Sequence, residues 1–204
     1  PTTPSLGCAV RLHFDSRGAV SNLRIEPQPP LPALRSDQQA ELLVHAVGLN
    51  FRDVLNVLGE YPGDPGPPGG DVAGVVSNAG AFGQLAANEA AFGLGIAPLA
   101  SVARAFAPLL AVQPAALAFA QACTLPTTWS TVHAALARGG LRASCAIVVQ
   151  AAAGGVGLKA VEYAQWLCAP AIGSAGRPHK HVWLQATGIG GLCSSRDGTA
   201  CAMG

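Results

Sequence analysis

The chain has 204 residues, and 50% of them are hydrophobic, which is enough for one large domain or two small ones around a substantial core. Its 12 basic and 11 acidic side chains leave a net charge of +1, so no strong field attracts nucleic acid or an anionic membrane surface. Prolines interrupt the long uncharged stretch 105–137 too often for a membrane-spanning helix. We therefore expect neither nucleic acid nor a membrane as a partner.

The six cysteines form neither a Cys-x-x-Cys pair nor a Cys/His box with zinc-finger spacing. The first residues also lack the basic and apolar stretches of a signal peptide. These features favour a cytoplasmic protein whose cysteines are reduced and mostly buried.

The first half of the chain is expected to be rich in strands. Apolar runs bounded by turn residues predict strands at 11–14, 23–25, 42–49 and 72–76. Residues 50–59 place apolar side chains at helical spacing before a terminal glycine, which indicates a short helix. The Pro/Gly-dense segment 61–70 is expected to be a loop. Residues 1–113 thus form a predicted strand-rich domain.

From Pro114 onward the composition changes to Ala-rich segments with helical character at 115–123 and 127–137. A strand at 146–149, a glycine-rich turn and a further helix follow. Alternation of helices and strands is typical of an α/β domain, which we expect to span residues 114–204.

The glycine-rich turn has the sequence expected of a dinucleotide-binding motif. It follows a continuous apolar run, typical of a strand buried on both faces, and precedes an amphipathic helix. The spacing Ala152-x-Gly154-x-x-Gly157 matches the dinucleotide fingerprint, except that Ala stands in place of the first Gly. Such a turn lets the backbone and the helix N-terminus approach a pyrophosphate. The alternative is an ordinary Ala/Gly-rich connection.

The residues after the next expected strand, near 170–174, indicate which cofactor the turn takes. No carboxylate that could hold the ribose of NAD lies between Glu162 and Asp197. Ser174, Arg177 and Lys180, with Gly176 among them, suit a 2′-phosphate instead. The sequence therefore predicts NADP, unless the two cations are ordinary solvated loop charges. Pro170 is unusual in a strand.

Two runs carry a resemblance to a known family: VGLNFRDVLNVLGEYPG at 47–63 and AAAGGVG at 151–157. They resemble the enoylreductase domain of type I polyketide synthases, in the zinc-free, quinone-oxidoreductase-like branch of the medium-chain dehydrogenase/reductase superfamily. The resemblance implies a GroES-like, strand-rich substrate domain followed by a Rossmann-type α/β domain that binds the cofactor, with the active site in the cleft between them.

The resemblance also implies a reaction and its residues. NADPH would deliver a hydride to the β-carbon of an α,β-unsaturated thioester on the phosphopantetheine arm of an acyl carrier protein, and the α-carbon would then be protonated. Tyr61 matches the tyrosine that can supply this proton, although it could instead pack only against its proline-rich loop. The implied cofactor contacts are Asn50 and Thr131 at the nicotinamide, Ala153, Gly154, Gly155, Val156 and Gly157 at the pyrophosphate, and Ser174, Arg177 and Lys180 at the 2′-phosphate.

Some family features are absent from the sequence. Gly70-Asp71 lacks the histidine of the zinc-dependent relatives and there is no cysteine lobe, so we expect no zinc. A lysine that the family carries further downstream lies beyond Gly204, which leaves only the first half of a Rossmann-type domain. The chain is then a fragment, a truncated gene product or half of a split domain. Beside an enoylreductase among neighbouring synthase domains, two readings stay open: a free-standing NADPH:quinone oxidoreductase and a non-catalytic remnant.

Overall fold

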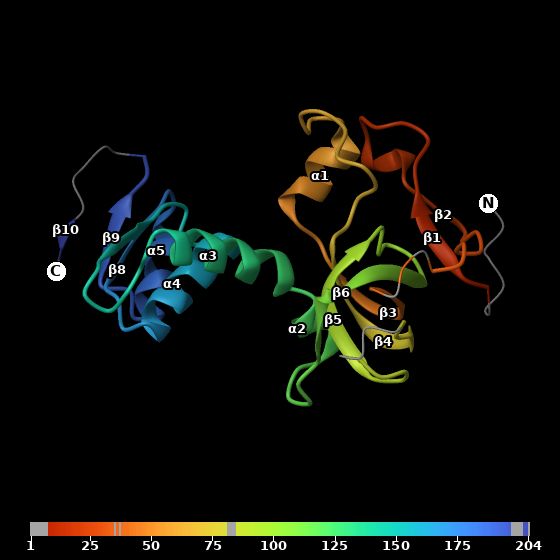
Figure 1. The fold of residues 1–204 in the computed structure, drawn as a ribbon. Coiled ribbons are helices and arrows are strands. Elements are labelled where there is room, and N and C mark those ends of the chain that lie inside the picture. Colours follow the sequence, from red (N-terminus) through yellow and green to blue (C-terminus); the bar gives the residue numbers. More distant parts are fainter. Residues whose placement is uncertain (1–7, 35, 37, 81–84, 197–201, 204) are drawn as a thin grey trace. The chain divides into compact units, whose positions relative to one another are not determined.

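The computed structural model describes residues 8–34, 36, 38–80, 85–196 and 202–203. The chain forms two compact units, Pro1–Thr127 and Thr128–Gly204 (Figure 1). The first is rich in strands and the second alternates strands and helices, as the sequence predicts.

The first unit is built on a closed antiparallel barrel of four strands (Figure 1). These are β3 (Gln39–Gly48), β4 (Asp71–Asn78), β5 (Ala90–Ile96) and β6 (Val102–Val112). Aliphatic side chains such as Ala40, Leu42, Val76 and Ala105 fill its interior and are fully buried. The hydropathy pattern predicts β3 and β4 but not β5 and β6, because the small apolar residues of β5 and β6 show little alternation with polar ones.

A two-stranded antiparallel sheet lies beside the barrel (Figure 1). It consists of β1 (Val10–His13) and β2 (Arg24–Pro27), joined through the short 3₁₀ helix η1 (Val20–Asn22). The two predicted strands around a turn are therefore confirmed. The backbone N–H of Leu12 donates to the carbonyl of Leu99, which attaches this sheet to the loop between β5 and β6.

Helix α1 (Phe51–Leu58) follows β3 directly, as predicted. Asn50 occupies the N-cap position and Gly59 the C-cap. Gly59 has φ of 75°, a left-handed conformation that glycine adopts without the steric cost that other residues incur. The loop from Tyr61 to Gly70 then leads into β4.

Helix α2 (Phe119–Ala122) belongs to the first unit, although the composition predicts that the second unit begins at residue 114. Ala122 and Cys123 are buried in a cluster with Ala73 of β4, and Phe119 packs against this cluster. The first unit therefore extends through Thr127, fourteen residues beyond the predicted boundary at 113.

The second unit contains a four-stranded sheet in the order β10-β9-β8-β7, in which β7, β8 and β9 are parallel. Its elements are β7 (Ile147–Val149), α4 (Gly155–Trp166), β8 (Ala171–Ala175), α5 (Pro178–Ala186), β9 (Gly191–Ser194) and β10 (Ala202–Met203). Helix α3 (Pro126–Arg138) precedes them. The repeated strand–helix–strand order and the parallel pairing make this unit a Rossmann-type fold.

Two local expectations need correction. Pro170 lies immediately before β8 rather than within it, so no ladder hydrogen bond is lost, and its carbonyl accepts from the N–H of Ile147. Residues 178–186 form helix α5, so Lys180 lies in a helix and not in a loop after the strand. Arg177 is the N-cap of α5 and Lys180 lies in its first turn.

The cysteines differ partly from the expectation. Cys123, Cys145 and Cys168 are free thiols, as predicted, but Cys193 is disulfide-bonded. Cys123 is buried, whereas Cys8 and Cys168 are exposed, so the side chains are less buried than expected. Cys201 lies outside the described residues. Within the described parts of the chain, no helix combines the length and the hydropathy needed to cross a membrane.

Candidate functional site

The glycine-rich turn connects β7 to α4, as the fingerprint predicts. The backbone N–H of Gly154 donates to the carbonyl of Ala151 at 2.8 Å, which closes the turn. Two bonds tie the turn to β8, because the N–H groups of Ala151 and Ala152 donate to Ser174 Oγ and to the Ser174 carbonyl, at 3.3 and 2.9 Å. Gly154 is the N-cap of α4, so the N–H groups of the first helical turn point out of the helix end.

The small residues of this turn have distinct roles. A Cβ at Gly157 would lie 2.4 Å from the Ala151 carbonyl oxygen, so only glycine allows α4 to pack this closely on the turn. A Cβ at Gly155 would meet nothing closer than Thr128 Cγ2 at 3.8 Å. Gly154 and Gly155 are exposed, and the space beside Gly155 is open to a ligand. This is the arrangement that a pyrophosphate requires.

Ala152 stands at the position where the fingerprint has its first glycine. Its side chain is fully buried in the core formed with Val149, Val161 and Leu184. A Cβ at Gly173 would lie 2.8 Å from the Ala152 Cβ. Gly173 of the neighbouring strand β8 therefore leaves room for the side chain of Ala152, so the turn accommodates alanine at this position.

Helix α3 packs beside α4 in the second unit. Tyr163 of α4 is 8% exposed, and its hydroxyl lies 2.9 Å from Nδ1 of His133 on α3. The Tyr163 ring also packs against Trp129, with centroids 5.9 Å apart. His133 thus contacts the buried hydroxyl of Tyr163 and links α3 to α4. Thr131 is exposed, one helical turn after Thr128, so it lies on the side of α3 that faces Gly155.

Basic residues gather where β8 and β9 end. Arg177 is exposed at the N-cap of α5, and Lys180 follows one turn later. Arg196, which no sequence motif marks, joins them, and its Nε lies 3.0 Å from the position of a Cβ on Gly176. The missing side chain of Gly176 therefore gives room for a guanidinium at this edge. The three cations fit a phosphate group, and the open glycine turn beside them fits a dinucleotide.

In the first unit, Asn50 is held by two carboxylates. Its Nδ2 donates to Asp71 Oδ2 at 3.1 Å, and its backbone N–H donates to Asp53 Oδ2 at 2.8 Å. Asp53 Oδ1 accepts from the N–H of Gly69, which ties the loop after α1 to the same helix end. The charge of Asp71 also acts on the nearby thiol of Cys123. Burial raises the pKa of this thiol, and the negative charge of Asp71 raises it further. The motif predicted Asn50 but not the carboxylates that hold it.

Tyr61 lies in the loop after α1 and is partly exposed. The guanidinium of Arg52 stands 5.4 Å from the centroid of its ring, close enough for a cation–π interaction. Arg52 Nη2 also donates to the carbonyl of Pro65 at 2.6 Å. The ring is thus held between helix α1 and the proline-rich loop.

The predicted residues therefore form two sets. Asn50 and Tyr61 belong to the first unit, whereas Thr131, Ala153 to Gly157, Ser174, Arg177 and Lys180 belong to the second. The structure contains no cluster of three or more His, Cys, Asp or Glu side chains suited to a metal ion among the residues it describes.

Comparison with known proteins gives a consistent set of relatives. No model of a known protein family matches the chain. It is 39% identical over 185 residues to the spectinabilin polyketide synthase system protein NorB of Streptomyces orinoci, covering 89% of this chain and 8% of that protein. It is 36% identical over 201 residues to the erythronolide synthase EryA2 of Saccharopolyspora erythraea, covering 97% of this chain and 6% of that protein. The chain thus spans less than a tenth of these relatives.

Solved structures show the same fold. The CurK enoyl reductase superposes with a TM-score of 0.84 at 31% identity, over 92% of this chain and 60% of that one. A quinone oxidoreductase of Escherichia coli complexed with NADPH superposes with a TM-score of 0.76 at 28% identity, over 93% of this chain and 60% of that one. The strand-rich unit is accordingly GroES-like, and the second unit is Rossmann-type. The chain therefore belongs to the medium-chain dehydrogenase/reductase superfamily, in the branch that includes polyketide synthase enoylreductases and quinone oxidoreductases.

Proposed function

We propose that the chain is part of an NADPH-dependent enoylreductase of a polyketide synthase. It would act on an α,β-unsaturated acyl thioester carried by the phosphopantetheine arm of an acyl carrier protein, in the cytoplasm and beside neighbouring synthase domains. When bound, NADPH supplies a hydride for the β-carbon of the substrate. The observation that carries the proposal is the glycine turn of β7 and α4, open at Gly155, in a chain whose relatives are polyketide synthases.

The cofactor contacts follow from the geometry of the second unit. The first N–H groups of α4, from Gly155 to Gly157, would bind the pyrophosphate, together with the backbone of Ala153 and Gly154. Arg177 and Lys180 would bind the 2′-phosphate. Ser174 already accepts from the N–H of Ala151, so its hydroxyl proton is available to a phosphate oxygen.

The nicotinamide and the substrate would be served by Asn50, Thr131 and Tyr61. Asn50 and Thr131 carry polar groups suited to the carboxamide of the nicotinamide. After hydride addition the substrate is an enolate, and the hydroxyl of Tyr61 would donate the proton that its α-carbon needs. Arg52 holds the Tyr61 ring in place for this role.

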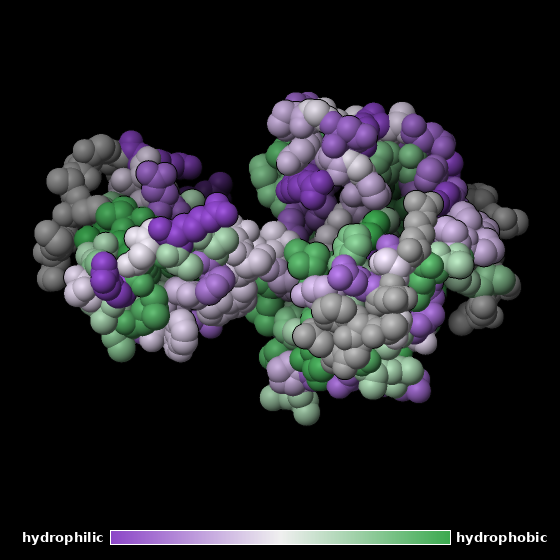
Figure 2. Space-filling view, in the orientation of Figure 1, coloured by the Kyte–Doolittle hydropathy of each residue, from purple (hydrophilic) through white to green (hydrophobic). Residues whose placement is uncertain are grey.

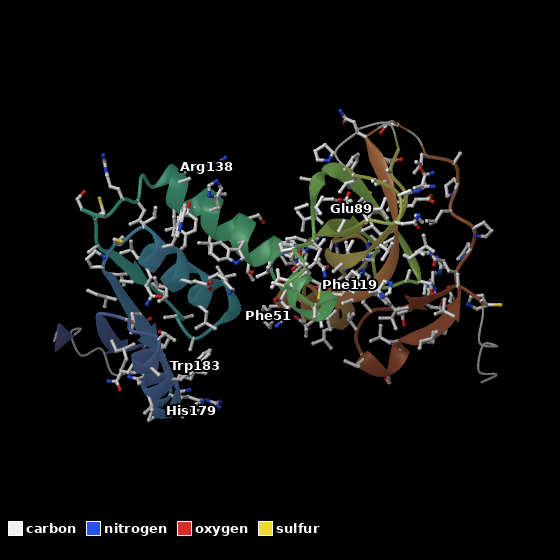
Figure 3. The ribbon with its side chains drawn as sticks, turned by 90° about the horizontal axis from the view of Figure 1, so that it is seen from below. Phe51, Glu89, Phe119, Arg138, His179 and Trp183 are labelled. Atoms are coloured by element: carbon white, nitrogen blue, oxygen red, sulfur yellow. The ribbon has the colours of Figure 1, made fainter. Side chains whose placement is uncertain are left out.

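An exposed apolar strip at the start of α1 and just before it supports an acyl substrate. Leu49, Phe51 and Val54 are 70%, 75% and 46% exposed, although such side chains are usually buried in soluble proteins. Phe51 projects from the start of α1 (Figure 3), and Figure 2 shows a hydrophobic area on the side of this helix. The strip adjoins Asn50 in sequence, so an acyl chain bound there would lie close to the proposed nicotinamide contact.

A free-standing NADPH:quinone oxidoreductase is the second candidate. It is favoured by the likeness to quinone oxidoreductases, including one from Coxiella burnetii with a TM-score of 0.80 at 25% identity. This activity would need no acyl carrier protein.

One experiment separates the candidates. NADPH binding is measured by titration, and NADPH consumption is then followed with a crotonyl pantetheine thioester and with a soluble quinone. We expect binding and consumption with the thioester, and the variant Gly155→Ala as a control should bind NADPH more weakly. Consumption with the quinone alone would favour the second candidate, and absence of NADPH binding would indicate a non-catalytic remnant.

A further inference from the structure

Asp71 is a buried carboxylate at the start of β4, and its side chain is 2% exposed. Three donors converge on it. Asn50 Nδ2 donates to Oδ2 at 3.1 Å, while the backbone N–H and the hydroxyl of Thr127 donate to Oδ1 at 3.0 and 2.5 Å. Thr127 is the second residue of α3, so Asp71 links the end of β3, the start of β4 and the first turn of α3.

The charge of Asp71 determines how the amide of Asn50 is turned. An ionised carboxylate only accepts hydrogen bonds, so Asn50 must direct its NH₂ group toward Asp71. The amide oxygen then stands at the opposite end of the side chain. Because the backbone N–H of Asn50 is bound to Asp53, the whole residue is held at two points.

We propose that Asp71 is a positioning residue that orients Asn50 so that its amide oxygen, an acceptor, faces the nicotinamide. The inference rests on the proposed function, in which Asn50 contacts the carboxamide of the cofactor. That carboxamide carries an NH₂ group, which an acceptor binds and a second NH₂ group would repel. Asp71 itself touches neither substrate nor cofactor and acts only through Asn50.

The isosteric variant Asp71→Asn separates charge from packing. The side chain keeps its size but has one oxygen and one NH₂ group. Its oxygen remains bound by the two donors of Thr127, which leaves its NH₂ group facing Asn50. Since two donors cannot pair, the amide of Asn50 turns over and presents its NH₂ group outward. The reciprocal double variant Asn50→Asp, Asp71→Asn exchanges the two side chains. The NH₂ group at position 71 then donates to the carboxylate at position 50, whose second oxygen again offers an acceptor to the nicotinamide.

The orientation is tested without cofactor, by NMR of protein whose asparagines carry an NMR-active nitrogen isotope. The chain has five asparagines, so the side-chain signals are few. We expect one N–H of Asn50 in the wild type to exchange slowly with water, and this protection to be lost in Asp71→Asn. Asn56 is an internal reference, because its amide binds Arg17 Nε and the carbonyl of Gly66 and should not change. An unprotected Asn50 amide in the wild type would overturn the inference, and this spectrum decides the point even if Asp71→Asn does not fold.

The consequence for binding is tested by NADPH titration. We expect Asp71→Asn to weaken NADPH binding about tenfold, the usual effect of one lost hydrogen bond with an unpaired donor. The reciprocal double variant should recover most of this loss, which a purely structural defect would not allow. Asp15→Asn, an exposed carboxylate in the first unit, serves as the control. If Asp71→Asn binds NADPH with unchanged affinity although its Asn50 amide has turned over, Asp71 has no positioning role. If the wild type itself does not bind NADPH, the proposed function is wrong. The NMR result alone then decides the orientation of Asn50.

Discussion

Gly157 of α4 lies so close to Ala151 that a Cβ at position 157 would stand 2.4 Å from the Ala151 carbonyl oxygen and 2.7 Å from Ala152 Cα. Real Cβ atoms do not approach backbone atoms this closely, so the contact requires glycine. Gly155 is only two residues away, but a Cβ there would have no neighbour closer than Thr128 Cγ2 at 3.8 Å, an ordinary van der Waals distance. The two glycines of one turn therefore differ in what they do for the protein.

This difference predicts opposite effects of the same substitution. Gly157→Ala would force α4 away from the turn and should lower the free energy of unfolding by about 1–3 kcal/mol, measured by urea denaturation. Gly155→Ala should leave stability nearly unchanged but weaken NADPH binding, because the methyl group projects where the pyrophosphate would approach. Equal effects of both variants on stability and on binding would contradict these assignments.

The basic residues at the end of β8 predict the choice of cofactor. Arg177→Gln with Lys180→Gln should weaken NADPH binding about tenfold to a hundredfold, since hydrogen bonds to charged groups are the stronger ones. NADH lacks the 2′-phosphate, so its affinity should change little. Arg196→Gln should act in the same direction, because its guanidinium lies over Gly176.

The matched control is Arg138→Gln, at the exposed C-terminal end of α3 (Figure 3). It removes one positive charge from the same unit without touching the proposed phosphate site. The assignment of the 2′-phosphate fails if NADPH and NADH lose affinity equally in the double variant.

The sequence could predict the parts of the site that are local in the chain. Strand β7, the glycine turn and α4 follow one another within twenty residues, and their apolar run, spacing and amphipathic pattern are all visible in the sequence. Asn50 is predicted in the same way, within the run that leads into α1. By contrast, Asp71 is 21 residues from Asn50 and 56 from Thr127 in the sequence, and no local pattern predicts that these residues are in contact.

Arg196 and the domain boundary cannot be predicted from the sequence for a similar reason. Arg196 reaches Gly176 only because β9 lies parallel to β8, and strand pairing is a tertiary property. Helix α2 has the Ala-rich composition of the second unit but packs on β4, where Ala122 is buried with Ala73. Composition indicates a helix, but it does not say which sheet the helix covers.

Acid should weaken the sheet of β1 and β2. Hydrogen bonding from Arg24 lowers the pKa of Asp15 from 3.8 to about 2, and hydrogen bonding from Arg11 lowers the pKa of Glu26. A carboxyl whose pKa is lower in the folded state stabilises the fold above its ordinary pKa, and this contribution is lost as the pH falls through the folded value. Stability should therefore decline between about pH 4 and pH 2.

The measurement is urea denaturation across this pH range for the wild type and for Asp15→Asn. The variant cannot ionise at this position, so its stability should decline less steeply with acid. Since both partners are exposed, the difference should shrink in high salt. Parallel curves for the two proteins would show that the pair of Asp15 and Arg24 contributes nothing to the acid sensitivity.

The hydroxyl of Tyr61 can be removed with little disturbance of the rest of the proposed site. Tyr61→Phe keeps the ring, and with it the cation–π contact of Arg52 at 5.4 Å, but removes the proton donor. Hydride transfer to the β-carbon does not need this hydroxyl, so NADPH affinity should stay unchanged. Protonation of the enolate at the α-carbon does need a donor on one face, and water can approach either face.

We therefore expect Tyr61→Phe to alter the configuration or the deuterium labelling at the α-carbon when an α-methyl enoyl thioester is reduced in deuterated water. A positioned general acid commonly contributes about 100-fold or more where nothing replaces it, so the size of the rate loss measures how well water substitutes for the phenol. Arg52→Met is the companion variant, because it keeps the Tyr61 hydroxyl but removes the cation–π contact that holds the ring. It should give a mixture of configurations at the α-carbon, with a smaller loss of rate than Tyr61→Phe. If Tyr61→Phe reduces the substrate at the wild-type rate and with unchanged configuration, Tyr61 only packs against its loop and the proton comes from another source.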